Sequence, residues 1–178
     1  MTSRTAALVT QIQSIACSAD GQWLKVKRIA RGKNAAVVEL NAQTLEIAAA
    51  PAGADWPPAS SNASIDKGLT TRTKVWSVGK FGAGLFVHSL KGAAIKAPLP
   101  FNDASLTVTT FAISADERYA LVGNSSGFVS VFDTHSGDEC FGARLHRGHV
   151  TAACFAPDGK QAFTGSAGGE LCAFDLPA

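Results

Sequence analysis

Histidine and cysteine are the residue types in this sequence whose spacing could support metal or acid–base chemistry. His146 and His149 flank Arg147 and Gly148, which gives a cluster typical of a metal ligand pair or a proton-transfer pair. Their spacing matches neither an acid–x–x–His nor a His–x–His metal motif. No Cys–x–x–Cys pair exists, so we expect no zinc, no cofactor and free thiols in a reducing compartment. The cysteines are Cys17, Cys140, Cys154 and Cys172.

The sequence also lacks the common catalytic and cofactor-binding motifs considered next. No serine lies in a nucleophile elbow. The glycines of Gly82–Gly84 follow a strand pattern without leading into a helix, so they do not match a dinucleotide-binding loop. We therefore expect a protein that is not an enzyme and has no small-molecule substrate.

Composition favours one folded domain with a sizeable core. Hydrophobic residues make up 46% of the 178 residues, charged residues make up 17%, and the net charge is only +2. No run of 18 apolar residues is present, so we expect no membrane span. The absence of a secretory signal pattern favours an intracellular, cytoplasmic protein, with nuclear and mitochondrial locations as open alternatives.

The last third of the chain contains two copies of one sequence repeat. Thr109–Asp133 reads TTFAISADERYALVGNSSGFVSVFD, and Thr151–Asp175 reads TAACFAPDGKQAFTGSAGGELCAFD. Asp116 and Asp158 are 42 residues apart, and so are Gly123 and Gly165. Repeats of about 40–45 residues with several short strands are typical of β-propeller blades. The sequence therefore predicts an all-β propeller built from four-stranded antiparallel sheets.

Each repeat alternates apolar strands with turns rich in Gly, Pro, Asp and Ser. The final unit predicts strands at Val150–Phe155, Gln161–Gly165 and Glu170–Asp175. The preceding unit predicts Val108–Ile113, Arg118–Gly123, Phe128–Asp133 and Glu139–Ala143. The first unit predicts Ile12–Cys17, Trp23–Arg28, Ala36–Leu40 and Thr44–Ala48. The second predicts Lys74–Gly79 and Leu85–Ser89, with a first strand near Ile65–Leu69.

Four units follow from these strands. We expect blades at residues 10–49, 63–100, 105–145 and 146–178, with an exposed Pro/Ala/Ser-rich loop insertion at 50–62.

This pattern resembles the WD-repeat family, strongly over about 105–178 and less strongly upstream. The segment Val150–Gly159 matches the family's first strand and its S-P-D-G turn, and Thr164 stands at the Ser-Gly position. The resemblance implies a structural role for repeat positions, in which a His, a Ser/Thr, a hairpin Asp and a Trp form a hydrogen-bonded tetrad. His146, Thr164, Phe132 and Phe174 stand at tetrad positions. The full set of structural repeat positions, with the turn and closing aspartates, is His146, Thr164, Asp116, Asp158, Phe132, Asp133, Phe174 and Asp175.

Two departures from the family pattern are visible. The hairpin Asp is replaced by Gly168 and Ser126, and the Trp is replaced by Phe132 and Phe174. Because Phe cannot donate a hydrogen bond, we expect no complete tetrad and looser blades.

The number of units also falls short of the roughly seven blades with which the family's rings usually close. We therefore favour an incomplete propeller over a closed four-blade ring. Met1–Ala6 stands where a preceding blade would have its fourth strand, so strand exchange between the termini is an alternative route to closure.

A basic stretch stands out in the first unit. Lys27 occupies the position of Gly123 and Gly165, where a neighbouring blade should cover the sheet. Either the lysines extend to an edge of the sheet, or this blade face is open and presents its charges to RNA or an acidic protein. A solvated terminal blade explains the same charges. Trp56, in the insertion, is a further candidate anchor for a partner. The candidate partner-binding residues are Lys25, Lys27, Arg28, Arg31, Lys33, Trp56, Arg147 and His149.

The leading functional hypothesis is a non-catalytic protein–protein interaction scaffold within a multi-subunit assembly. An RNA- or ribonucleoprotein-associated propeller that uses residues 25–33 is one alternative. A propeller-type enzyme with a site in the central channel is another, but no paired acids converge in the sequence to support it.

Overall fold

The structure is a computed structural model. It describes residues 3–29, 35–56 and 107–177 with their side chains, and the backbone of four further strands between residues 69 and 99. All regular elements in these ranges are β-strands, which form antiparallel sheets. A search of the same residues finds no helix that is long and apolar enough to cross a membrane.

The described strands form four sheets. The first blade has three strands in the order β2-β3-β4, and the second blade has the order β5-β6-β7-β8. The third blade has the order β12-β11-β10-β9, and the terminal blade has the order β1-β15-β14-β13. The strands are β1 (Ser3–Ala7), β2 (Gln11–Cys17), β3 (Trp23–Ile29), β4 (Ala36–Asn41), β5 (Leu69–Thr70), β6 (Lys74–Val78), β7 (Leu85–Ser89), β8 (Lys96–Leu99), β9 (Val108–Ile113), β10 (Tyr119–Asn124), β11 (Phe128–Asp133), β12 (Glu139–Arg144), β13 (Val150–Phe155), β14 (Gln161–Ser166) and β15 (Glu170–Asp175).

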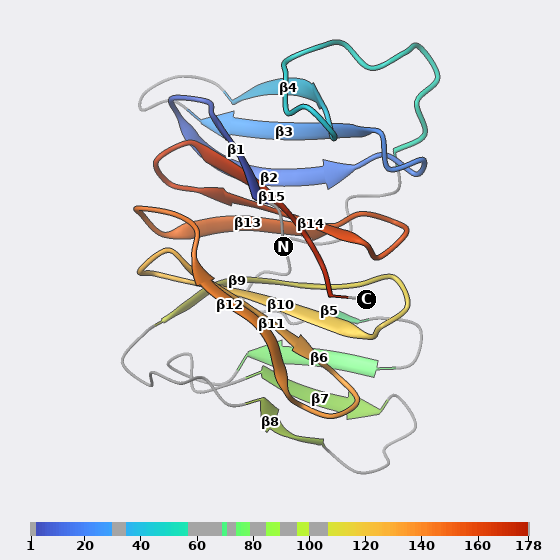
Figure 1. Ribbon diagram of the computed structural model, residues 1–178, viewed down its shortest axis with the longest axis vertical. Helices are drawn as coiled ribbons and strands as arrows, with labels where there is room; N and C mark the ends of the chain where they lie inside the picture. Colours follow the sequence, from blue (N-terminus) through green and yellow to red (C-terminus); the bar gives the residue numbers. More distant parts are fainter. Residues whose placement is uncertain are drawn as a thin grey trace.

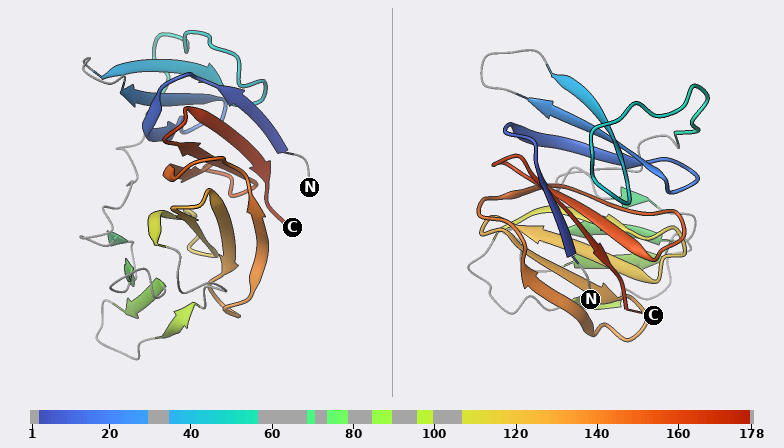
Figure 2. Two further views of the ribbon diagram at one scale, coloured as in Figure 1. Left: turned by 90° about the vertical axis from the view of Figure 1, so that its left-hand side faces the viewer. Right: turned by 45° about the horizontal axis from the view of Figure 1, so that its top comes forward.

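The blades lie along an arc. The terminal blade is placed between the first and third blades, since β13 packs against both β2 and β9. The second blade lies at the far end of the row, beyond the third (Figure 1). The left view of Figure 2 shows that the described strands follow a curve that does not close. The expected all-β, incomplete propeller is confirmed, with its opening between the first and second blades.

The two ends of the chain pair within the terminal blade. β1 lies antiparallel to β15, in a register that runs from Ser3 opposite Phe174 to Ala7 opposite Glu170. Strand exchange between the termini therefore takes place, yet it does not close the ring, because the opening lies elsewhere. The terminal strand pairing that the sequence suggested is therefore present, whereas the closed four-blade ring is not.

The blades differ in how many of their faces are covered. In β10 and β14 nearly every residue is buried, as expected for sheets that are packed on both sides. In the first blade burial alternates along the strands, and Ile12, Leu24 and Leu40 point into a core shared with Phe163 of β14. Period-2 alternation means that only one face of this sheet is packed against another blade.

Glycine sets the distance between packed blades. A Cβ atom added at Gly123 of β10 would lie 2.6 Å from Val150, and one at Gly165 of β14 would lie 2.6 Å from Ile12. Side chains cannot approach that closely, so each glycine lets the next blade dock. The equivalent residue of the first blade is Lys27, whose side chain is exposed.

Inter-blade hydrogen bonds repeat with the same period. Thr109 Oγ1 of β9 donates to the carbonyl of Val150 at 2.5 Å, and Thr151 Oγ1 of β13 donates to the carbonyl of Ile12 at 2.5 Å. Together with the glycines, they join the third, terminal and first blades through one recurring interface.

One predicted strand is wrong. Thr44–Ala48 forms only a single β-bridge, between Ile47 and Leu40. The Asn41 side chain accepts hydrogen bonds from the main-chain N–H groups of Gln43 and Thr44, at 2.9 and 3.0 Å, and this turn ends the strand. The positive φ of Leu45, 59°, reverses the chain further. The first blade is consequently left with three strands.

Candidate functional site

Three repeated turns converge on one end of the blades and surround a cavity of about 600 Å³, here called the turn-face cavity. Each turn joins the first two strands of its blade: residues 18–22 in the first, 114–118 in the third and 156–160 in the terminal blade. Neighbouring turns nearly touch, because a Cβ at Gly159 would lie 4.0 Å from Asp116 Oδ2. The principal polar lining residues are Asp20, Gln22, Gln43, Asp116, Arg118, Tyr119, Asp158, Lys160, Gln161 and Asp175.

Each turn is held by its aspartate. Asp20 Oδ1 accepts hydrogen bonds from Ser18 Oγ and from the N–H of Gln22. These two donors lower the pKa of Asp20 below its usual range, the hydroxyl of Ser18 more strongly than the N–H of Gln22. Asp158 Oδ1 accepts from the N–H of Lys160 at 3.0 Å.

The turn of the third blade repeats this arrangement. Asp116 Oδ1 accepts from Ser114 Oγ at 2.6 Å and from the N–H of Arg118 at 3.0 Å. Burial raises the pKa of Asp116, but these hydrogen bonds outweigh it and the net pKa is lowered. The cavity is thus lined by carboxylates that the turns hold in place, with the exposed side chain of Lys160 among them.

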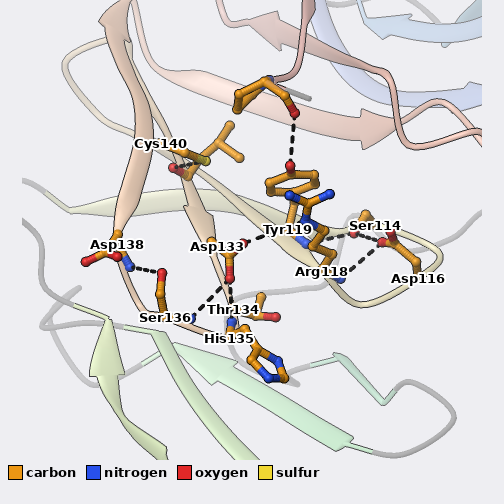
Figure 3. A network of polar contacts seen from close by, with 12 residues as sticks. Ser114, Asp116, Arg118, Tyr119, Asp133, Thr134, His135, Ser136, Asp138 and Cys140 are labelled. Carbon is orange, nitrogen blue, oxygen red and sulfur yellow. Dashed lines mark hydrogen bonds and ion pairs between the residues drawn. The ribbon is translucent and has the colours of Figure 1, made fainter.

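Arg118 links the turn of the third blade to the end of β11. Its Nε lies 3.7 Å from Asp133 Oδ2, and its Cζ lies 4.9 Å from the centre of the Tyr119 ring. Figure 3 shows Arg118 over Tyr119, between Asp133 and the turn of Ser114 and Asp116. Both charge signs therefore face the cavity from fixed positions.

Tyr119 and Asp133 fix the rest of this wall. The Tyr119 hydroxyl donates to the carbonyl of Pro177 at 2.9 Å, which ties the segment after β15 to the third blade. Asp133 Oδ1 accepts from the N–H groups of His135 and Ser136, and the bond from Ser136, then that from His135, lowers the pKa of Asp133. In the part of the chain that is described, no three His, Cys, Asp or Glu side chains come together as a metal site.

The position corresponding to the family tetrad lies inside the terminal blade. The His146 ring is buried, and its Nε2 lies 2.8 Å from Thr164 Oγ1. Its Nδ1 makes no hydrogen bond with a described atom, and Glu170 Oε2 lies 3.7 Å away. Burial lowers the pKa of His146, and the Glu170 carboxylate opposes that shift. Sequence reasoning missed Glu170, which lies two residues beyond the expected hairpin position, Gly168.

The two phenylalanines that replace the family Trp are both core residues. Phe174 stacks on Phe141 of β12, with ring centroids 4.8 Å apart and an interplanar angle of 19°. Phe132 is 2% exposed. Asp175 Oδ1 accepts from Gln161 Nε2 at 2.9 Å and so links β15 to β14. These side chains hold the sheets together and so have a structural role.

Two of the candidate basic residues are engaged within the molecule. Lys25 Nζ lies 3.7 Å from Glu39 Oε1 and 4.0 Å from the centre of the Trp56 ring. Arg28 donates to the carbonyl of Leu8 at 3.1 Å. Lys27 is exposed, and no carboxylate in the described ranges pairs with it. Arg31 and Lys33 lie outside the described residues.

The remaining candidates lie at a different place. The Arg147 side chain is 97% exposed, its N–H donates to Glu170 Oε2 at 2.9 Å, and His149 is also exposed. Both precede β13, whose other end leads into the turn at the cavity. The structure therefore does not bring Arg147 and His149 together with the turn-face cavity.

Two comparisons with known proteins bear on the family. The family model described as "WD domain, G-beta repeat" matches residues 142–175, which include His146, Thr164 and Phe174. The β-propeller domain of Cps50 (Swd1) from Myceliophteria thermophila superposes with a TM-score of 0.50 at 14% sequence identity. Residues 142–175 thus match a WD repeat, and the chain as a whole has a β-propeller fold. The matched residues include the whole terminal-blade segment from β13 to β15.

The similarity extends along almost the whole chain. The match to Swd1 covers 93% of this chain and 52% of that one. The computationally designed Ika8 protein matches with a TM-score of 0.51 at 17% identity, over 93% of this chain and 46% of that one. The chain therefore spans about half the length of the solved chains it matches. No curated protein matches its sequence.

Proposed function

We propose that the chain is a non-catalytic scaffold that binds a segment of a partner protein in the turn-face cavity. WD-repeat propellers typically act by binding other proteins. The observation that carries this proposal is the convergence of three repeated turns, one from each of three blades, on a single cavity of about 600 Å³. A volume of that size suits a short peptide segment.

Charge at the cavity favours a polar partner. Asp20, Asp116 and Asp158 present carboxylates, while Arg118, which pairs with Asp133, and the exposed Lys160 present cations. Because the turns hold the carboxylates and Asp133 pairs with Arg118 before binding, less ordering entropy is lost when a partner docks. A segment that carries both a basic and an acidic side chain fits this arrangement.

The basic stretch supports an RNA partner less well. Lys25 is already paired with Glu39 and covered by Trp56, and Arg28 donates to a main-chain carbonyl. We therefore place the partner at the cavity.

Site-specific photo-crosslinking tests this proposal. A photoreactive residue is introduced at Gln22, which lines the cavity, and in a matched variant at Arg147, which lies at the opposite end of the terminal blade. In cell extract we expect discrete protein adducts from position 22 only, which are lost in the Asp158→Asn and Lys160→Glu backgrounds. Asn keeps the oxygen that accepts the Lys160 N–H, so the turn is preserved. Equal adducts from both positions, or adducts that nuclease removes, would contradict the proposal.

A further inference from the structure

A second surface, separate from the turn-face cavity, lies at the outer edge of the first blade. We propose that the free edge of β4 binds an extended, acidic segment of a partner protein as the fourth strand of this blade. The inference stands on the first blade alone and does not depend on binding at the cavity.

The first blade lacks a strand that the other blades have. The second, third and terminal blades each contain four strands, whereas the described residues of the first blade contain three. β4 lies at the outer end of the row in Figure 1. After β4 the chain returns to it only at residues 46–48, around the bridge between Leu40 and Ile47. The described residues therefore fill the strand position outside β4 only in part.

Main-chain groups of β4 point to this unfilled position. The carbonyl of Glu39 accepts from the N–H of Ala48 at 3.1 Å, and the N–H of Asn41 donates to the carbonyl of Glu46 at 3.0 Å. The main-chain N–H and C=O groups of odd-numbered residues in β4 thus point away from β3. Alternation along the strand places the N–H and C=O of Val37 on the same edge, beyond the reach of residues 46–48. Such unpaired groups are what an added strand binds.

Apolar surface accompanies these unpaired groups. Val37 is 55% exposed and Ile47 is 64% exposed, two of the largest apolar exposures in the described residues. In an added strand, every second side chain would lie on the same face of the sheet as Val37 and cover it. We therefore expect the segment to alternate apolar residues with polar ones.

The charge beside β4 indicates that the polar residues of the bound segment are acidic. Lys27 lies directly opposite Val37 in the β3–β4 register, is exposed, and has no carboxylate partner in the described ranges. Lys25, by contrast, is neutralised by Glu39. Lys27 thus leaves an unpaired positive charge beside Val37 in the described residues, and this charge favours a segment with Glu or Asp.

The outer face of the blade is unsuited to another propeller blade. Lys27 occupies the position at which Gly123 and Gly165 admit their neighbours. The chain's own residues 50–56 also cross this face, where Glu39 Oε2 accepts from the N–H of Ala50 at 2.9 Å and Trp56 covers Lys25. A second copy that paired its own β4 here would place two Lys27 side chains on one face, which is unfavourable. An acidic strand from another protein fits best.

Fluorescence anisotropy with designed peptides tests the proposal. The full chain is titrated against a fluorescein-labelled peptide of alternating valine and glutamate, as long as β4. One control alternates valine and lysine, and a second carries N-methyl groups along one edge so that it cannot pair with β4. We expect the acidic peptide to bind about tenfold or more tightly than either control.

Two variants locate the binding. Val37→Pro removes the outward N–H without a loss to the β3–β4 ladder, because proline is tolerated at such edge positions, and we expect about a tenfold loss of affinity. Lys27→Glu should reverse the preference toward the lysine peptide. Lys160→Glu, at the cavity, should leave peptide binding unchanged, which separates this proposal from the preceding one.

Three results would overturn the proposal. Equal binding of the N-methylated peptide would show charge attraction without strand pairing, and it decides the matter even if Val37→Pro fails to fold. Unchanged affinity of a folded Val37→Pro variant would place the peptide elsewhere. A dimer in light scattering that Val37→Pro dissociates would make a second copy of the chain the occupant.

Discussion

The interface between the terminal and first blades and the outer face of the first blade present the same repeat position in opposite settings. At the interface, Gly165 leaves no room for a Cβ, which would lie 2.6 Å from Ile12. On the outer face, Lys27 stands at the equivalent place and extends into solvent. One position in the repeat thus decides whether a blade accepts a neighbour or ends the row. Terminal units of repeat proteins commonly carry such a polar outer face.

Exchanging the two residues is the strongest test of this difference between the two faces. Gly165→Lys should destabilise the protein by about 3 kcal/mol or more, because the side chain must displace Ile12 from a packed interface. Urea-induced unfolding measures the change. Lys27→Gly is the matched control, and it should cost at most about 1 kcal/mol through the flexibility of glycine in a strand. Similar losses in both variants would mean that the interface does not depend on close approach.

The inter-blade hydrogen bonds provide a smaller effect. Thr151→Val and Thr109→Val each keep the side-chain volume but remove the donor to the carbonyl of Ile12 or Val150. We expect a loss of about 1–2 kcal/mol for each variant in urea unfolding. The exposed Thr107→Val should change stability by less than about 0.5 kcal/mol. A neutral Thr151→Val would show that glycine packing alone holds the blades together.

The buried histidine of the terminal blade predicts a dependence on pH that the first blade should lack. Burial lowers the folded-state pKa of His146 below 6.5, the ordinary pKa of histidine, so below that pH the unfolded chain binds a proton that the folded chain does not. Stability should therefore fall as the pH drops below about 6.5, toward the lower folded pKa. Urea midpoints at about pH 7.5 and pH 5 measure this loss.

Glu170 provides the control for this pH dependence. Because its carboxylate raises the pKa of His146, Glu170→Gln should lower that pKa further and enlarge the acid loss. His146→Gln should flatten the profile in the same range. A wild-type profile that does not change between the two pH values would contradict the assignment.

The smallest effect is expected from restoring one member of the family tetrad. Gly168→Asp should shift the melting temperature very little, because Phe174 still cannot donate a hydrogen bond and Glu170 already lies near His146. A large gain in melting temperature would show that the hairpin acid alone stabilises the blade.

Local pattern was enough to predict much of the fold. The strand expected at Val150–Phe155 has the bounds of β13, and the pattern at Phe128–Asp133 those of β11, because turn residues punctuate each repeat. Thr44–Ala48 failed because the Asn41 turn, which apolar alternation does not reveal, ends the pairing. The glycine at 123 and 165 and the lysine at 27 marked the open face from sequence alone.

The candidate site was harder to predict. The aspartates of the repeated turns were assigned structural roles, which their hydrogen bonds fit. That the same turns enclose a cavity depends on how the blades sit together, which no single repeat encodes. Glu170 was missed for a related reason, since its approach to His146 depends on the shape of the hairpin between β14 and β15.

The pairing of β1 with β15 has a consequence for how the chain folds. Ser3 in β1 can pair only after Phe174 in β15 has been made, so the terminal blade is the last of the four described blades to be completed. Contacts of such long sequence separation slow folding and leave strand edges exposed in the meantime. Of the four described blades, the one that the WD-repeat model matches is therefore the most vulnerable to aggregation while the chain is being made.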